Sequence, residues 1–267
     1  MRRLRVALLF GLLTLLTQVG GFAYLAARWL SRRWKITGWA APLGVFLALY
    51  ASATVALPFM APSFGRVALS CFEGGSLQVR SPLYCVLNRN YLTPGAKRAT
   101  KALSEAMAAE YPGTVTLVLD AGFPFLDGFP LLPHLSHDDG RKLDIAFYYR
   151  DESGAALDRA TRSPIGYFAF EKPVDGAVLP CEGRADLLTL RWDMGLLQGL
   201  FPAWALDEAR TGAALRWLAS EGPEFGVERI FIEPHLSQRL GVSSQIVRFQ
   251  GCRAARHDDH IHFQVKE

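Results

Sequence analysis

The stretch His134-Leu-Ser-His137-Asp-Asp-Gly-Arg-Lys-Leu-Asp144 places two histidines and an aspartate at the start of an apolar, alternating run. A second stretch near the C-terminus, His257-Asp-Asp-His260-Ile-His262, holds three more histidines, so five of the chain's six histidines lie in these two places. A catalytic zinc ion takes three nitrogen or oxygen ligands from the protein and keeps one position open for water. We therefore predict a zinc site that both stretches build together, with an imidazole to spare.

Both stretches lead into predicted strands. Residues 143–149 are aromatic and apolar, and alternation along this strand puts Asp144 on one defined face. Residues 260–265 alternate in the same way, which places His260 and His262 on a common face. Either both imidazoles bind one metal ion, or one binds it while the other transfers protons.

The two stretches resemble the metal motifs of the penicillin-insensitive murein endopeptidase family. The first is similar to that family's His-x-Ser-His-x-x-Gly-x-x-x-Asp pattern, and the second to its His-Asp-Asp-His-x-His pattern. The family belongs to the lysostaphin, D-Ala-D-Ala peptidase and hedgehog group of zinc folds. The resemblance covers roughly residues 110–267, and the two motifs occur in the family's order.

The resemblance implies a role for each motif residue. The zinc ligands would be His137, Asp144 and His262. The catalytic residues would be His260, as base or transition-state stabiliser, and His257, beside the reacting water. Supporting or substrate-contacting positions would be His134, Ser136 and Arg141.

Several polar residues outside these roles have simpler interpretations. We expect Asp120 to be a polar residue at a strand end and His235 to belong to a helix start. Arg141 and Arg256 are either solvated charges or groups that grip a substrate carboxylate. Arg141 and Lys142 also depart from the family pattern, which tends to have smaller or acidic residues there, and this affects the substrate more than the chemistry.

The function that the resemblance implies is zinc-dependent hydrolysis of amide bonds in peptidoglycan peptides. Zinc lowers the pKa of its bound water towards ~7 and polarises the scissile carbonyl. Two alternatives stay open: a D-alanyl-D-alanine carboxypeptidase, and a zinc-stabilised peptidoglycan-binding module without turnover. The presence of a non-ligand histidine, His260, beside the three expected ligands favours an enzyme.

The N-terminal residues have a membrane-anchor composition. Residues 7–27 and 36–61 are uncharged, and each run is long enough for a helix across a hydrocarbon core of ~30 Å. We expect two transmembrane helices within a membrane anchor of residues 1–66, followed by a zinc metallopeptidase-like domain of residues 67–267. The first 66 residues hold eight basic residues and no acid, which leaves the remainder with 21 basic and 25 acidic residues. The basic excess therefore flanks the membrane runs, and no nucleic-acid-binding surface is indicated.

Membrane orientation is not decided by charge. With two spanning helices, the loop holds Arg28, Arg32, Arg33 and Lys35, and the opposite flanks hold Arg2, Arg3, Arg5 and Arg66, which is a tie under the positive-inside rule. Four cysteines outside the apolar runs suit two disulfides in an oxidising space. Of three possible connectivities we expect Cys71–Cys85 with Cys181–Cys252. The catalytic domain is thus expected on the periplasmic side of a bacterial inner membrane.

The rest of the soluble part predicts one α+β domain with an antiparallel sheet. Thr93 is expected to cap a helix that begins at Pro94 and continues through Ala109. Helices are also expected at 196–201 and 207–220. Strands are expected at 115–119 and around 231–232, the latter ending at Pro234.

Overall fold

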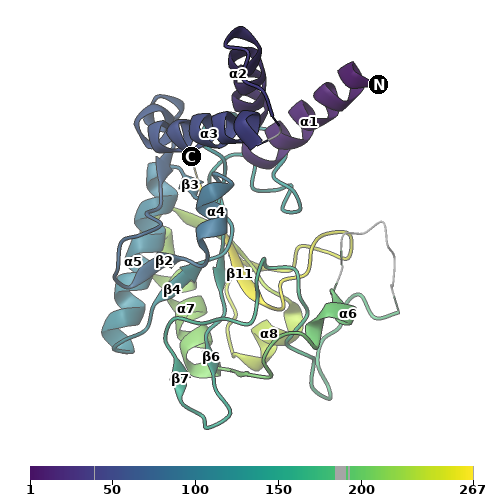
Figure 1. The fold of residues 1–267 in the computed structure, drawn as a ribbon. Helices are drawn as coiled ribbons and strands as arrows, with labels where there is room; N and C mark the ends of the chain where they lie inside the picture. Colours follow the sequence, from purple (N-terminus) through teal and green to yellow (C-terminus); the bar gives the residue numbers. More distant parts are fainter. Residues whose placement is uncertain (39, 184–190, 192, 267) are drawn as a thin grey trace.

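A mixed α+β domain carries a bundle of helices at its N-terminal end (Figure 1). The computed structural model describes residues 1–38, 40–183, 191 and 193–266. The helices of the bundle are α1 (Arg2–Thr17), α2 (Gly20–Arg33) and α3 (Ala40–Met60), followed by the 3-10 turn η1 (Ala61–Phe64). The domain contributes α4 (Pro82–Val86), α5 (Pro94–Glu110), α6 (Gly195–Gln198), α7 (Glu208–Ser220), η3 (Gly222–Phe225) and α8 (Pro234–Arg239).

A six-stranded sheet forms the centre of the domain, in the order β10-β9-β11-β5-β4-β2. Its strands are β2 (Leu77–Val79), β4 (Thr116–Val118), β5 (Lys142–Ala146), β9 (Val227–Phe231), β10 (Val247–Arg248) and β11 (His260–Val265). The inner pairs are antiparallel, while β2 with β4 and β9 with β10 are parallel, so the sheet is mixed rather than purely antiparallel. Two small sheets join β1 (Val67–Ala68) to β3 (Tyr91–Leu92), and β6 (Tyr149–Arg150) to β7 (Ala156–Leu157) and β8 (Ala205–Leu206).

The core lies between the sheet and the helices α5 and α7, which run side by side along it (Figure 1). Ile145, Ile261 and Phe263 are fully buried in this layer. Because side chains alternate along a strand, Asp144 and His262 point to the other side of the sheet. The same packing that holds the core therefore presents the histidines on the opposite face.

Most of the expected elements of the domain are present. The strand β11 has the predicted bounds, and α5 begins at Pro94 with the Thr93 hydroxyl accepting a hydrogen bond from Ala96 N. The helix α7 matches the helix expected at 207–220, whereas the helix expected at 196–201 is only the single turn α6. The predicted strand at 143–149 is interrupted after Ala146, because the chain leaves the central sheet there and joins the three-stranded sheet at Tyr149.

The prediction of two transmembrane helices is wrong. Among the described residues one helix, Ala40–Phe64, is long and apolar enough to cross a membrane, judged by length and composition. The first apolar run is divided into α1 and α2 at Gln18, which has a positive φ of 62°. Polar contacts fix this break: Gln18 Oε1 accepts from Phe125 N, and Thr17 O accepts from Asn88 Nδ2. Hydrogen bonds to the domain thus hold open a break that a continuous membrane helix would not contain.

Both expected disulfides are present. Cys71 is bonded to Cys85, and Cys181 is bonded to Cys252. The first closes a short loop next to the N-terminal helices, and the second joins two loops that are 71 residues apart in the sequence. This cysteine usage indicates a membrane or extracytoplasmic protein.

Candidate metal centre

The register of two neighbouring strands brings the two histidine-rich stretches together. On β5 and β11, Asp144 pairs with His262 and Ala146 pairs with His260. His137 reaches the same point from the loop that precedes β5, where Gly140 adopts a positive φ of 67°. Strand pairing therefore joins residues that are more than 100 positions apart in the sequence.

Three ligand-type atoms form a small triangle at this point. Asp144 Oδ1 lies 2.9 Å from His262 Nδ1 and 3.2 Å from His137 Nε2. The third side, between His137 Nε2 and His262 Nδ1, is 3.1 Å. All three side chains are almost completely buried. Such a set of close, buried, electron-donating atoms is typical of a metal site.

His260 lies beside this triangle. Its Nε2 is 3.4 Å from Asp144 Oδ1, and its Nδ1–H donates to Asp259 Oδ1 at 2.6 Å. The Asp259 carboxylate is in turn held by Ser163 Oγ and by the backbone N–H of Phe168. This chain of hydrogen bonds fixes the imidazole of His260 with Nε2 facing Asp144.

His137 is also fixed by a hydrogen bond. Its Nδ1–H donates to the carbonyl of Ala121 at 3.0 Å, which leaves Nε2 as the unprotonated nitrogen of the neutral ring. That nitrogen is the one in the triangle. Metal-binding histidines commonly have this arrangement, with one nitrogen on the ion and the other N–H on a backbone carbonyl or carboxylate.

His134 is held differently. Its Nδ1 donates to Asp120 Oδ2 at 2.8 Å and lies 3.2 Å from Asp144 Oδ2, while its Nε2 is 3.4 Å from Gly166 O. Both ring nitrogens therefore face oxygen atoms. Asp120 itself forms a buried ion pair with Arg89. His134 thus connects Asp144 to a second buried carboxylate.

Two groups among the described residues could hold a metal ion. One is His134, His137 and Asp144, and the other is His257, His260 and His262; within each group the ligand atoms lie within 4.8 Å of one another. The triangle described above takes members from both groups. His257 completes the cluster, with its ring 4.9 Å from that of His260 and 5.4 Å from that of His262.

The charges in the cluster are strongly coupled. Burial would raise the pKa of Asp144, but the neighbouring His137, His260 and His134 lower it well below its usual range. Burial would lower the pKa of His260, yet Asp144 and Asp259 outweigh it and raise the value to about 9. For His262 burial prevails and lowers the pKa to about 4. The cluster therefore contains an ionised carboxylate next to at least one neutral imidazole, which are the protonation states that bind metals.

One buried nitrogen of the cluster is left without a hydrogen bond. His262 Nε2 bonds to no described residue, whereas Asp144 Oδ2 lies 3.2 Å from His134 Nδ1. Leaving a buried polar atom unpaired costs roughly 1–3 kcal/mol. Because Nε2 is the ring nitrogen opposite the Nδ1 atom of the triangle, an ordered water beside the cluster would satisfy it while an ion binds Nδ1.

The cluster opens into a hollow of about 200 Å³. Ser136, Tyr167, Gln250 and Arg253 line it together with the histidines and Asp144. Leu135 is 47% exposed at its edge. The buried donor atoms therefore border a hollow that could receive a small molecule or a peptide end.

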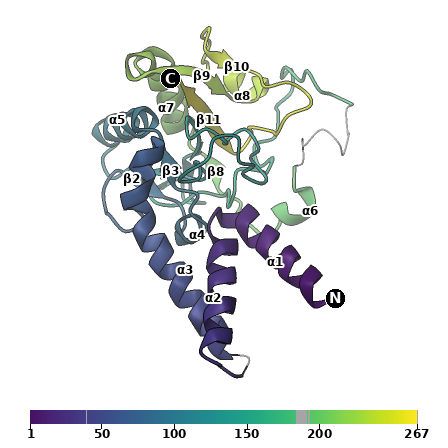
Figure 2. The same cartoon turned by 90° about the horizontal axis from the view of Figure 1, so that it is seen from above.

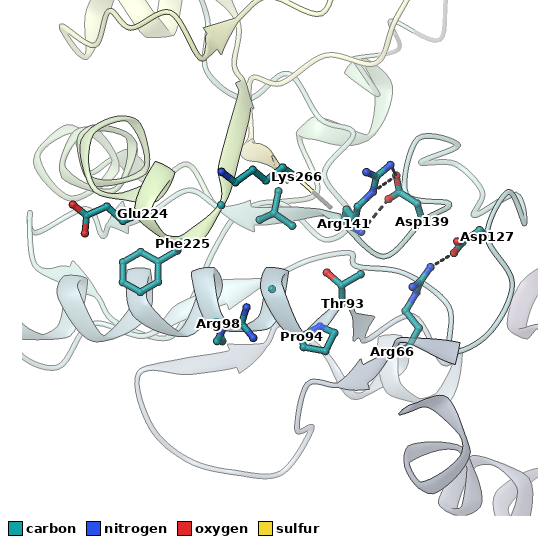
Figure 3. Close-up of a pocket in the computed structure, with 13 residues that line it drawn as sticks. Arg66, Thr93, Pro94, Arg98, Asp127, Asp139, Arg141, Glu224, Phe225 and Lys266 are labelled. Atoms are coloured by element: carbon teal, nitrogen blue, oxygen red, sulfur yellow. Dashed lines mark hydrogen bonds and ion pairs between the residues drawn. The ribbon is translucent and has the colours of Figure 1, made fainter. Parts of the chain in front are cut away.

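Arg141 lies elsewhere. Its guanidinium pairs with Asp139 in the same loop, and both residues line a larger hollow of about 600 Å³ (Figure 3). The lining of that hollow also includes Arg66 and Asp127, which pair with each other, and contains no histidine. Of the expected site residues, His134, Ser136, His137, Asp144, His257, His260 and His262 meet in one hollow, and Arg141 does not.

Two buried carboxylates have a larger part in the site than the sequence indicated. Asp120 follows a strand, as expected, but its side chain is buried and contacts His134. Asp259, one of the two aspartates between His257 and His260, accepts from His260 Nδ1–H and so orients the ring. By contrast, His235 lies in the first turn of α8 and bonds to Glu171 O, and Arg256 pairs with Asp258.

A search for relatives does not identify the chain: no protein-family model matches it, and no curated protein has a significantly similar sequence.

Proposed function

We propose that the protein is a membrane-anchored zinc metallopeptidase that hydrolyses amide bonds in peptidoglycan peptides. The triangle formed by His137, Asp144 and His262 carries this proposal. Two ligands on a tetrahedral zinc, with bonds of about 2.0–2.1 Å, lie roughly 3.3 Å apart. The three sides of 2.9, 3.1 and 3.2 Å are close to that separation. Two imidazoles and one carboxylate are also a ligand set that zinc accepts.

Zinc held there would polarise a scissile carbonyl and acidify a bound water. His260 is placed to hold a proton next to the reacting atoms. Because Asp259 accepts from its Nδ1–H, its Nε2 is the nitrogen that faces the hollow, where it can take or donate a proton. His134, which is bonded to Asp120, lies against Asp144, and the hollow would hold the substrate beside the cluster.

The sequence resemblance described above favours peptidoglycan peptides as substrates. A D-alanyl-D-alanine carboxypeptidase has the same chemistry and is the nearest alternative. A zinc-stabilised binding module without turnover is the third. The oriented His260 and the open hollow favour turnover over binding alone, because a purely structural zinc site is closed by four protein ligands.

The arrangement of the N-terminal helices supports an extracytoplasmic domain. The helices α1 and α2 diverge from the break at Gln18, so the N-terminus and the turn between α2 and α3 both lie away from the domain (Figure 2). Arg2 and Arg28 accordingly line one shared hollow between α1 and α2. Seven of the eight basic residues among the first 66 lie near the N-terminus or in the last part of α2 and the turn after it: Arg2, Arg3, Arg5, Arg28, Arg32, Arg33 and Lys35. Arg66, which follows α3 on the domain side, is the exception, and under the positive-inside rule this distribution favours a domain outside the cytoplasm.

Digestion of purified muropeptides by the full chain in detergent tests the function. The zinc-loaded protein should release products whose masses identify the bond that is cut, and Asp144→Ala or removal of zinc with a chelator should abolish the release. Conversion of a cross-linked dimer into two peptides whose masses sum to that of the dimer plus one water would indicate an endopeptidase. Loss of a terminal D-alanine would indicate a carboxypeptidase. Zinc binding without any product would instead favour the binding module.

A further inference from the structure

One wall of the hollow beside the histidine cluster is a short loop that carries a positive charge, on Arg253. Gln250, Arg253, Ala254 and Ala255 of this loop line the hollow. Arg253 is exposed and has no hydrogen-bond or ion-pair partner within the described part of the chain. Apart from Arg253 and the histidines, the only charged side chain among the described residues of the lining is Asp144, which belongs to the metal cluster.

The loop that carries Arg253 is held in place on both sides. Cys252, its immediate neighbour, is bonded to Cys181 of a distant loop. Arg191 donates to Gly251 O at 3.3 Å and pairs with Glu233 at 3.0 Å. On the C-terminal side, Glu233 accepts from the backbone N–H of His257. The backbone beside Arg253 is therefore fixed, while its guanidinium has no partner among the described residues.

The neighbouring cation of the loop cannot replace Arg253. Arg256 is engaged with Asp258, through Nε at 2.9 Å from Oδ1. Ser136, in the lining of the same hollow, is half-buried, and its hydroxyl forms no hydrogen bond to another described residue. A fixed arginine with an unpaired hydroxyl and the Gln250 amide nearby suits recognition of a carboxylate and the adjoining peptide amides.

We propose that Arg253 forms a carboxylate-binding subsite beside the metal cluster, so that the preferred substrate is a peptide with a free carboxylate next to the scissile amide. This inference rests on the proposed function, since it concerns what enters the same hollow. The carboxylate has two possible sources in a peptidoglycan stem: the C-terminal α-carboxylate, or a carboxylate within the stem. Both present the same planar anion to the guanidinium.

Direct binding tests the subsite independently of cleavage. The probe is a fluorescent stem pentapeptide ending in D-alanyl-D-alanine, prepared as the free acid, as the C-terminal amide, and with only its internal carboxylates amidated. Dissociation constants are measured with the zinc-loaded full chain in detergent. We expect wild-type protein to bind the free acid roughly 3- to 30-fold more tightly than one of the two amidated forms, which is the range for a partly solvated, charge-assisted pair. The amidated peptide that binds more weakly than the free acid identifies which carboxylate Arg253 recognises.

Variants of Arg253 test whether this residue causes the preference for the free acid. Arg253→Ala should bind all three peptides alike, Arg253→Glu should prefer the amidated form, and Arg253→Lys should retain part of the preference because it keeps the charge without the planar fork. Arg229→Ala, an exposed arginine on β9 outside the hollow, is the matched control and should behave as wild type. Equal binding of all peptides by the wild type, no binding of any, or an unchanged preference in Arg253→Ala would each overturn the subsite. Binding with the expected preference but without cleavage would contradict the proposed hydrolysis and leave the subsite supported.

Discussion

Asp144 and His262 are direct partners in the β5–β11 ladder, and Asp144 Oδ1 lies 2.9 Å from His262 Nδ1. A cross-strand pair holds its side chains side by side without any contribution from a mobile loop. Two of the three proposed ligands are therefore fixed by the backbone of the sheet. His137 joins them from a loop, but its Nδ1–H bond to Ala121 O restricts the ring.

The first prediction concerns metal content. The full chain should bind one zinc ion, and His137→Ala, Asp144→Ala and His262→Ala should each reduce bound zinc well below one per chain, because each removes a corner of the triangle. Zinc would be measured by elemental analysis after dialysis. His235→Ala is the control, since this histidine is bonded to Glu171 O and lies outside the cluster. Full zinc content in all three triangle variants would show that the ligands are assigned wrongly.

The second prediction concerns the buried support of the site. Asp120→Ala leaves the buried Arg89 without its carboxylate and should lower the free energy of unfolding by about 3–5 kcal/mol. Glu105→Ala, which breaks an exposed pair with Lys101, should cost less than about 1 kcal/mol. Urea unfolding of both variants in detergent would measure this difference.

The stability cost of Asp120→Ala should depend on pH, because the Asp120 carboxyl titrates. Burial would raise the pKa of Asp120, but Arg89 and His134 lower it below its ordinary value. A carboxyl whose pKa is lower in the folded state stabilises the fold above the unfolded-state pKa of about 3.9, and this contribution is lost as the pH falls towards the folded-state pKa. The difference between wild type and Asp120→Ala should therefore shrink below about pH 4. A difference that grows in acid would refute this explanation.

The parts of the fold that follow local rules could be predicted from the sequence. The alternating pattern of residues 260–265 predicted the bounds of β11, and the Thr93-Pro94 pair predicted the start of α5. Bringing His137, Asp144 and the C-terminal histidines to one site also required the order of strands in the sheet. That order depends on pairing between distant segments, which periodicity does not reveal. The expectation that the two histidine-rich stretches form one site came from the motif resemblance.

Other features depend on contacts that no local pattern contains. The uncharged run of residues 7–27 satisfies the length criterion for a membrane helix, yet Gln18 finds a partner in Phe125 N and Thr17 finds one in Asn88. The importance of Asp120 arises in the same way, because its partners Arg89 and His134 come from other segments. A single polar residue within an apolar run was the available signal for the break, although its partner could not be inferred.

The third prediction tests the packing of α1 against α2. A methyl group on Gly21 would lie 2.0 Å from Thr14 Oγ1 and 2.5 Å from the backbone oxygen of Phe10, so α1 would have to move. Gly21→Ala should therefore destabilise the protein by about 1–3 kcal/mol. Gly11→Ala is the matched control, because nothing lies within 4 Å of its added methyl group and alanine favours a helix. Thermal unfolding that is equal for the two variants would contradict the close packing of the two helices.

The fourth prediction concerns membrane orientation. The described cysteines are all in disulfides, so single cysteines can be introduced with little background labelling. Lys35→Cys, in the turn after α2, should react with a membrane-impermeant maleimide only after the membrane is permeabilised. Glu152→Cys, exposed on the domain, should react in intact cells. The opposite pattern would place the domain in the cytoplasm.

The fifth prediction separates metal binding from proton transfer. His260 and His262 lie two residues apart on β11, but only His262 belongs to the triangle, while His260 is oriented by Asp259. His260→Ala should therefore keep its zinc and its fold, yet lose roughly 10²–10⁴-fold in the rate of muropeptide cleavage, the usual contribution of a positioned proton-transfer group. His262→Ala should lose both zinc and activity. Asp259→Asn provides a further comparison, because it keeps the size of the side chain but changes the hydrogen bond that orients His260, and it should reduce the rate without removing zinc. Zinc stoichiometry and cleavage rate are measured side by side on all three variants. Near-wild-type cleavage by His260→Ala would exclude its catalytic role, and loss of zinc in His260→Ala with retention in His262→Ala would exchange the two assignments.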